Sequence, residues 1–297
     1  MNLLARLARE FLLALQFFTR IPVTGRLADW VGFSPDLLRA SAAHFPAVGV
    51  LVGAVAALVF AVVQSSLPDS VFTPLVAAAL STVATVLLTG AFHEDGLADL
   101  ADGLGGSADA ARALEIMKDS RVGAFGALAL VLALLAKVAL LALLGGVEIV
   151  QIEQLEQLAS LDLQAQAQAP ASDYPVGAYA CIALLLGHTV SRGLPLLLIR
   201  FLPHLAGSGA SKSKPLADRI TTPRLLIGLG WCAAALALGA MVLEPVNLLV
   251  ACGFSLLALL TIGRLLKRRL QGFTGDGLGA AQQVCEIAFY LGLAVSL

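Results

Sequence analysis

Residues 122–145 read VGAFGALALVLALLAKVALLALLG, a run in which Lys137 is the only charged side chain. About 20 consecutive, mostly apolar residues are enough for a helix to cross the hydrocarbon core of a bilayer. Other stretches have the same character: 43–65, 71–92, 176–201, 224–243, 246–263 and 279–297. The sequence therefore predicts an all-α integral membrane protein, a polytopic helical bundle of about seven transmembrane helices.

The overall composition agrees with a membrane protein. Hydrophobic residues make up 59% of the 297 positions and charged residues only 13%, whereas a typical soluble domain carries about 25% charged residues. The mean hydropathy is +0.89. The net charge of −1 gives no basic footprint, so we expect no nucleic-acid partner. No stretch reads as a separate soluble domain, and residues 1–297 are predicted to form a single transmembrane domain.

Lysine and arginine are distributed unevenly among the segments that connect the apolar stretches. Neither residue occurs in 66–70, 146–175 or 244–245. The positive-inside rule places the segments that carry Lys and Arg in the cytoplasm. We therefore expect the N-terminus inside and the C-terminus outside. The segments expected in the cytoplasm are 93–121, 202–223 and 264–278.

The first eighteen residues have the pattern of an amphipathic helix. Arg6, Arg9 and Glu10 share one face and interrupt any apolar core that a cleaved signal peptide would need. The opposite face carries Leu4, Leu7, Phe11, Leu15 and Phe18. Such a helix either lies in the membrane interface or packs against the bundle, and the sequence leaves both possibilities open.

Residues 92–106 read FHEDGLADLADGLGG and concentrate carboxylates. On a helix, Asp95, Asp99 and Asp102 fall within about 60° of one another. Like charges 4 Å apart repel by about 1 kcal/mol in water and about 4 kcal/mol at an effective dielectric constant of 20. Such a face calls for a cation, and carboxylate oxygens suit Mg²⁺, Mn²⁺ or Ca²⁺. The alternative is a solvated acidic helix. We interpret the three aspartates as metal ligands, and Glu94, which points off their face, as peripheral.

Further candidate residues follow in two places. In 117–126 (MKDSRVGAFG), Lys118 and Arg121 are natural phosphate partners, or positive-inside anchors, and Asp119 is a further metal or orienting candidate. Arg192, four residues after His188 within a span, could bind phosphate with both arms of its guanidinium, or could pair with an acidic residue on a neighbouring helix.

The stretch 272–280 reads GFTGDGLGA and opens the last apolar run. Asp276 within it could be only a helix N-cap. The charge distribution, however, puts Asp276 on the same membrane face as Asp95, Asp99 and Asp102. Asp276 therefore joins them as the fourth candidate metal ligand.

Together these blocks resemble the cobalamin synthase family, also called adenosylcobinamide-GDP ribazoletransferase. The matching blocks are HEDGLAD (93–99), KDSRVG (118–123), GDGLGA (275–280), QFFTRIPV (16–23), FPAVG (45–49) and SRG (191–193). They cover nearly the whole chain in the family's order and spacing. Two departures are visible: Glu94 stands where the family usually has a hydrophobic residue, and Gln283 where it often has Glu.

The resemblance implies a single transmembrane catalytic domain that joins adenosylcobinamide-GDP to α-ribazole or α-ribazole 5′-phosphate and releases GMP. It implies Mg²⁺ as cofactor and a place in the bacterial cytoplasmic (inner) membrane, with the active site facing the cytoplasm. Catalytic roles then fall to Asp95, Asp102 and Asp119. His93 joins Lys118, Arg121 and Arg192 as a candidate phosphate-binding residue. The expected partners are the two small-molecule substrates and the lipid bilayer, and homo-oligomerisation is left open.

Two other functions are weighed against this one. A CDP-alcohol phosphotransferase also couples an aspartate cluster at the membrane face to pyrophosphate cleavage, but its motif has an Arg soon after Asp-Gly. Here no Arg follows Asp95-Gly96 until Arg112. A secondary transporter would place its carboxylates near the bilayer midplane, between internal repeats. No repeat is visible, and the densest acidic cluster lies at the end of a span.

Overall fold

The computed structural model describes residues 3–161, 176–205 and 219–297, and these residues are almost entirely helical. No β-strand occurs among them, apart from one isolated bridge between His204 and Phe273. The described helices are α1 (Leu3–Phe18), α2 (Gly25–Val31), α3 (Pro35–Ser41), the 3₁₀ turn η1 (Ala42–His44), α4 (Phe45–Ser66), α5 (Thr73–Thr89), α6 (Phe92–Gly106), α7 (Ala110–Ile116), α8 (Ala124–Leu161), α9 (Ala178–Gly193), α10 (Pro195–Phe201), α11 (Thr222–Gly239), α12 (Pro245–Arg269) and α13 (Gly275–Ser296).

The long helices confirm a polytopic membrane bundle. In the described part of the chain, six helical stretches are long and apolar enough to cross a bilayer, and the bent pair α5–α6 would make a seventh. A helix suits lipid because it satisfies all its inner backbone hydrogen bonds by itself. Several begin with a proline in the first turn, where no backbone N–H is needed. Examples are Pro46, Pro74, Pro223 and Pro245.

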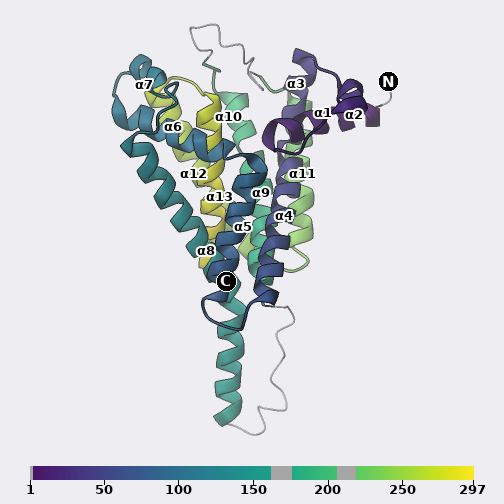
Figure 1. The fold of residues 1–297 in the computed structure, drawn as a ribbon, viewed down its shortest axis with the longest axis vertical. Helices are drawn as coiled ribbons and strands as arrows, with labels where there is room; N and C mark the ends of the chain where they lie inside the picture. Colours follow the sequence, from purple (N-terminus) through teal and green to yellow (C-terminus); the bar gives the residue numbers. More distant parts are fainter. Residues whose placement is uncertain (1–2, 162–175, 206–218) are drawn as a thin grey trace.

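The bend between α5 and α6 sets the direction of the Asp-rich helix. Gly90 closes α5 in the left-handed region at φ 69°, and Ala91 follows at φ 60°. Two successive residues with positive φ turn the chain sharply, so α6 meets α5 at 90°. As Figure 1 shows, α6 runs across the end of the bundle and does not continue the span.

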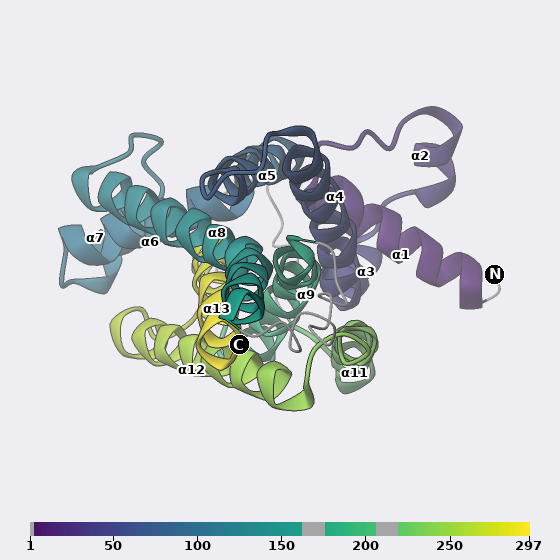
Figure 2. The ribbon, with the colours of Figure 1, turned by 90° about the horizontal axis from the view of Figure 1, so that it is seen from below.

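The two ends of the bundle differ in what they carry. Helices α1, α2, α3, α6, α7 and α10 gather at one end in Figure 1, together with the end of α12 and the start of α13. The C-terminus lies toward the opposite end. Figure 2 shows α9 and α13 between the outer helices, and α9 packs on both α4 and α13. The three segments predicted to share a membrane face thus have their described parts at one end.

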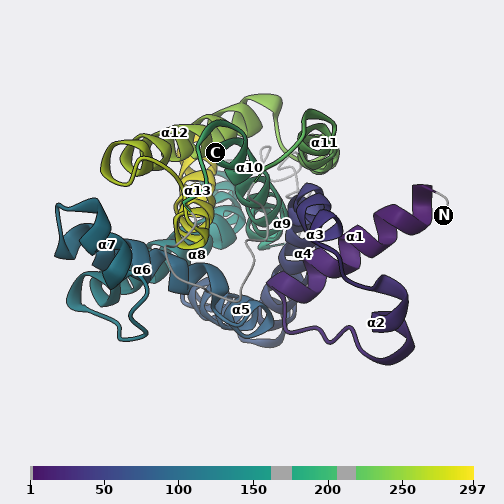
Figure 3. The same ribbon diagram turned by 90° about the horizontal axis from the view of Figure 1, so that it is seen from above.

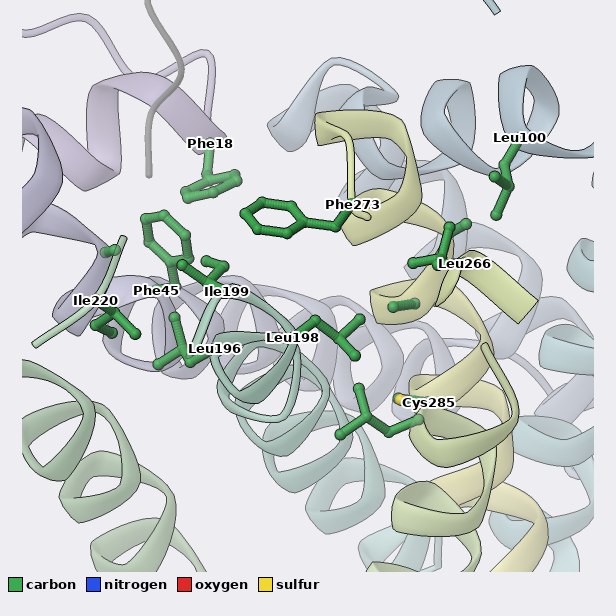
Figure 4. Close-up of a cluster of buried hydrophobic side chains, with 14 of the residues drawn as sticks. Phe18, Phe45, Leu100, Leu196, Leu198, Ile199, Ile220, Leu266, Phe273 and Cys285 are labelled. Atoms are coloured by element: carbon green, nitrogen blue, oxygen red, sulfur yellow. The ribbon is translucent and has the colours of Figure 1, made fainter. Parts of the chain in front are cut away.

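A buried apolar cluster lies beneath that end and joins α1, α4, α10, α12 and α13. Phe18, Phe45 and Phe273 belong to it, and the rings of Phe18 and Phe45 meet edge to face at 4.4 Å (Figure 4). Phe18 also packs against Phe92 at the start of α6. The start of the Asp-rich helix therefore rests on the bundle core.

The N-terminal helix packs on the bundle through a buried ion pair. Glu10 is fully buried, and it accepts hydrogen bonds from Arg224 of α11 at 2.7 Å and from Arg6 at 3.0 Å. A carboxylate can be buried in this way because it is paired and hydrogen-bonded. Of the two possibilities left open by the sequence, packing against the bundle is therefore observed.

One helix is longer than its apolar run. The span predicted at 122–145 agrees with a candidate span at Ala124–Val147, and helix α8 continues beyond it to Leu161. The extension is rich in Glu, Gln and Leu, which are strong helix formers, and loss of hydrophobicity alone does not end a helix. The rest of the predicted exterior segment, residues 162–175, lies outside the described residues.

Candidate active site

Helix α6 lies directly against the start of α13, as Figure 3 shows from above. The contact depends on two glycines. A Cβ at Gly96 would lie 2.9 Å from the carbonyl oxygen of Asp276, and one at Gly279 would lie 3.3 Å from that of His93. Because neither glycine has a side chain, the two helices approach closely, and the aspartates of α6 lie beside Asp276 of α13.

The C-terminal half of α6 is fixed by two polar contacts. Arg269 at the end of α12 donates to the carbonyl oxygens of Leu104 and Ser107 at 3.1 and 2.7 Å. These carbonyl groups lack partners within their own helix, and a cation suits the negative end of a helix. Arg269 therefore fixes this end of α6.

Asp102 makes the second contact. Its two carboxylate oxygens accept hydrogen bonds from the backbone N–H groups of Gly123 and Gly126, at 2.7 and 2.8 Å. Asp102 thereby caps the N-terminus of α8. A side chain at Gly126 would occupy the space of this carboxylate. Each oxygen keeps a further lone pair, so the metal and catalytic roles of Asp102 stay predictions.

Asp95, Asp99 and Asp276 form what we call the acidic cluster. Asp95 is exposed, and the other two are half-buried. Burial, together with the charges of Asp95, Asp276 and Asp102, raises the pKa of Asp99 to about 6. The like charges of these carboxylates therefore repel one another, as the sequence of α6 indicated.

The donor chemistry of the acidic cluster fits Mg²⁺. Within the described residues, no three acidic, histidine or cysteine side chains already converge on one point at metal-ligand distance. Mg²⁺ usually takes only one or two carboxylates and completes its shell with water and substrate phosphates. Two helices presenting aspartates to the same face meet that requirement, and the ligand set stays a prediction.

The loop before α8 lies next to Asp102. Arg121 donates to both carboxylate oxygens of Asp119, the closest contact being 2.5 Å. These hydrogen bonds from Arg121 lower the pKa of Asp119 to about 2. Lys118 is exposed. Since Gly123 contacts Asp102, the loop and its two cations are tied to α6, but Asp119 is engaged by Arg121, and its catalytic role stays a prediction.

His93 packs against the N-terminal helix. It is buried, and its ring stacks on Phe18 at 5.5 Å with an interplanar angle of 14°. The structure therefore gives His93 a packing role at the α1–α6 contact. Its predicted contact with phosphate is untested.

A buried polar network lies inside the bundle, between α8, α9 and α13, and centres on Glu286. Lys137 lies 2.6 Å from one carboxylate oxygen of Glu286, to which Tyr290 also donates at 3.0 Å. The other oxygen accepts from Gln282 at 2.6 Å and lies 3.0 Å from His188. Lys137, the only charged side chain of the apolar run at 122–145, therefore has a structural role, because its side chain is buried and paired.

The sequence interpretation of Glu94 as a peripheral residue was wrong. Its side chain is buried and accepts a hydrogen bond from Gln283 of α13 at 3.1 Å. Glu94 does point off the aspartate face, as predicted, but that direction faces the packed interior and not solvent. The two positions noted as departures from the family pattern therefore contact each other.

Arg192 is buried beside His188. Its Nη1 atom donates to the carbonyl oxygen of His188 at 3.1 Å and lies 3.0 Å from the Nδ1 atom of the same residue. No carboxylate pairs directly with it among the described residues. Three buried atoms have no hydrogen-bond partner there: Nε of Arg192, Nε2 of His188 and Oε2 of Glu94. The phosphate role of Arg192 stays a prediction.

Sequence reasoning did not single out Gln282 or Tyr290. Gln282, Glu286 and Tyr290 recur at every fourth position, which places them on one helical face. A face with three polar side chains inside an apolar span was the signal that could have identified the network.

The comparisons with known proteins agree over nearly the whole chain. Residues 10–294 match the cobalamin-5-phosphate synthase family. The chain is 64% identical over 300 residues to the adenosylcobinamide-GDP ribazoletransferase of Polaromonas sp. (strain JS666), covering 100% of both proteins. It is 54% identical over 308 residues to the protein of the same name from Albidiferax ferrireducens, covering 99% of this chain and 100% of that one. No solved structure matches the chain significantly.

Fold and comparisons together define a polytopic helical membrane enzyme, and more narrowly a transferase of cobalamin biosynthesis. The chain belongs to the cobalamin-5-phosphate synthase family. This confirms the resemblance, the fold class and the enzyme class predicted from the sequence. The CDP-alcohol phosphotransferase and transporter alternatives are set aside.

Proposed function

We propose that this protein joins adenosylcobinamide-GDP to α-ribazole or its 5′-phosphate and releases GMP, which completes the nucleotide loop of cobalamin. The observation that supports this reaction is the match to ribazoletransferases along the full chain. The acidic cluster agrees with it, because transfer from a pyrophosphate requires negative charge to be neutralised and held in position.

The reaction breaks a phosphoanhydride bond and forms a phosphoester bond. The hydroxyl oxygen of the ribazole attacks the phosphorus on the cobinamide side of the pyrophosphate, and the bond from that phosphorus to the bridging oxygen breaks. GMP leaves with the bridging oxygen, and the hydroxyl proton passes to a carboxylate of the acidic cluster. Such reactions depend mainly on the alignment of the two substrates and on stabilisation of the transferring group.

Asp95, Asp99 and Asp276 are the residues that would hold Mg²⁺. The ion would supply positive charge to the pyrophosphate oxygens. Lys118 and Arg121 stand on the loop tied to α6 through Asp102, where they would contact the phosphates. Asp102 and Asp119 would then act in support: Asp102 fixes α6 to α8, and Asp119 orients the guanidinium of Arg121.

The proposed location is the bacterial cytoplasmic membrane, with the acidic cluster facing the cytoplasm. The distribution of Lys and Arg supports it, since the three basic segments have their described parts at the end that carries α6. A cytoplasmic site would also receive its nucleotide-bearing substrates directly. We expect both small molecules and the surrounding lipid as partners, with self-association left open.

Turnover in defined lipid tests the reaction. The full-length protein, reconstituted in phospholipid nanodiscs, is incubated with adenosylcobinamide-GDP, α-ribazole 5′-phosphate and Mg²⁺, and GMP is quantified by chromatography. We expect GMP and the corrinoid product to form in equal amounts, and only when both substrates are present. GMP release without an acceptor would instead indicate a hydrolase.

A further inference from the structure

The sequence block QFFTRIPV (16–23) has no role in the site described so far, yet its arginine lies beside the start of α6. Arg20 follows the last turn of α1, and its backbone N–H donates to the carbonyl oxygen of Leu88 at 2.7 Å. The turn before it is fixed by Thr19, whose hydroxyl oxygen accepts from the N–H of Ile21 at 3.2 Å. The end of α1 is therefore joined to the end of α5, just before the chain bends into α6.

The guanidinium group of Arg20 lies directly against the backbone of this bend. A Cβ at Gly90 would lie 2.8 Å from Nη2 and 2.9 Å from Cζ of Arg20. Gly90 also has a φ of 69°, a conformation that a residue with a side chain disfavours. The glycine thus serves the bend and leaves room for the guanidinium group. Arg20 is exposed, and it forms no ion pair with a carboxylate among the described residues.

The end of α1 also contacts the helical face that carries the aspartates. On α6, Phe92 falls within about 60° of Asp95, so it opens that face. The ring of Phe17 packs against the ring of Phe92 with centroids 5.2 Å apart, and Phe17 precedes Arg20 by three residues. One peptide unit and one helical turn separate Gly90 from Asp95, which puts their Cα atoms at most about 10 Å apart. Arg20 is therefore a cation at the start of the aspartate face.

The charge of a pyrophosphate gives this cation a function. A pyrophosphate brings negative charge to a site that is itself acidic, so it needs cationic donors in addition to the ion. The fork of Arg121 is engaged by Asp119, whereas the fork of Arg20 has no carboxylate partner in the described part of the chain. A guanidinium group keeps its charge at any ordinary pH, and its planar fork matches phosphate oxygens.

We propose that Arg20 binds a phosphate oxygen of the pyrophosphate in adenosylcobinamide-GDP. This rests on the proposed function and adds to it a residue from a part of the chain that carries none of the other candidate site residues. Two other roles compete with it. A cation at the end of α5 suits the negative end of that helix, which would be a structural role. The headgroup phosphate of a lipid has the same chemistry as the pyrophosphate and is the other possible ligand.

Binding of adenosylcobinamide-GDP without an acceptor tests Arg20 directly. The wild type, Arg20→Gln and Arg20→Lys are titrated by calorimetry in phosphatidylcholine nanodiscs with Mg²⁺. Arg26→Gln is the matched control, because Arg26 is also exposed and without an ion pair among the described residues. It belongs to α2, and Figure 3 shows α2 and α6 on opposite sides of the bundle.

The three variants should differ in affinity and not in stability. Loss of a hydrogen bond to a charged group predicts that Kd rises roughly 10- to 100-fold in Arg20→Gln. Arg20→Lys should show a smaller rise, because Lys keeps the charge but lacks the fork. The control should stay within about twofold of the wild type. All melting temperatures should stay near that of the wild type, since the side chains are exposed. In turnover, KM for adenosylcobinamide-GDP should rise and KM for α-ribazole 5′-phosphate should not.

The other outcomes contradict the proposal. An unchanged Kd with a lower melting temperature in Arg20→Gln, restored in Arg20→Lys, would show that the cation supports the end of α5. An unchanged Kd, together with loss of a stabilisation that phosphatidylglycerol gives the wild type, would show that Arg20 holds lipid headgroups. An equal rise in Kd for Arg26→Gln would indicate a diffuse basic surface. If the wild type binds the substrate but forms no GMP once the acceptor is added, the proposed function fails, while the Kd values still decide the role of Arg20. No binding by the wild type refutes both.

Discussion

Replacing Lys137 by Met should destabilise the bundle strongly, because it leaves Glu286 charged and buried. The Lys137–Glu286 pair has a 2.6 Å contact, and both side chains are inaccessible to solvent. Removing one partner of a buried ion pair costs about 3–5 kcal/mol. Glu286 keeps donors from Gln282 and Tyr290, so we expect the lower end of this range, about 3 kcal/mol. That corresponds to roughly a 150-fold shift in the unfolding equilibrium.

The double variant Lys137→Met/Glu286→Gln separates charge from packing. With the carboxylate neutralised, the buried charge is gone, and the double variant should regain most of the lost stability. Thermal unfolding of detergent-solubilised protein, followed by intrinsic fluorescence, measures Lys137→Met, Glu286→Gln and the double variant against Lys267→Met, an exposed control. Additive losses in the double variant, or a loss below about 1 kcal/mol in the single one, would refute the reasoning.

The acidic cluster, the buried arginine, the topology and the α8 cap give four further tests. Asp95→Asn should lower kcat by about 100- to 1,000-fold with little rescue by excess Mg²⁺, while Asp36→Asn, an exposed matched control, stays near wild type; similar modest effects at both would mean that the site is misplaced. Arg192→Lys should lose activity at normal abundance, because Lys lacks the planar fork; low abundance with normal specific activity would instead show a structural role. In a cysteine-free background, Ser160→Cys should react with an impermeant thiol reagent in intact cells, and labelling only after permeabilisation contradicts the topology. Gly126→Ala should cost about 1–2 kcal/mol by displacing the Asp102 cap, and an unchanged melting temperature would argue against that contact.

The spans could be predicted from sequence because lipid imposes a simple rule on the chain. Each backbone polar group in hydrocarbon must be satisfied internally, so long apolar runs become helices regardless of their neighbours. The same local logic placed Asp95, Asp99 and Asp102 on one helical face. The same reasoning could not predict where α8 ends, because the end of an apolar run does not end a helix when helix-forming polar residues follow it.

The environment of individual acidic side chains depends on contacts that are distant in the sequence. Glu94 looked peripheral because its direction on α6 was known but its neighbour was not, and Gln283 lies 189 positions away. Helical periodicity does not distinguish Asp102 from Asp95 and Asp99, but in the structure Asp102 accepts hydrogen bonds from the backbone of Gly123 and Gly126. Helical periodicity gives the direction of a side chain, whereas its role depends on what packs there.

The ion pair between Glu10 and Arg224 has a consequence for the biogenesis of the protein. Its partners are separated by 214 positions, so the N-terminal helix cannot reach its final place until α11 has been synthesised. At about 5–20 residues per second, the ribosome needs about 10–40 s to cover that distance. During this interval Glu10 lacks Arg224, α1 has an exposed apolar face, and the bilayer surface is the environment that accommodates both. The N-terminal helix is therefore expected to be among the last elements to dock, although it is the first to be made.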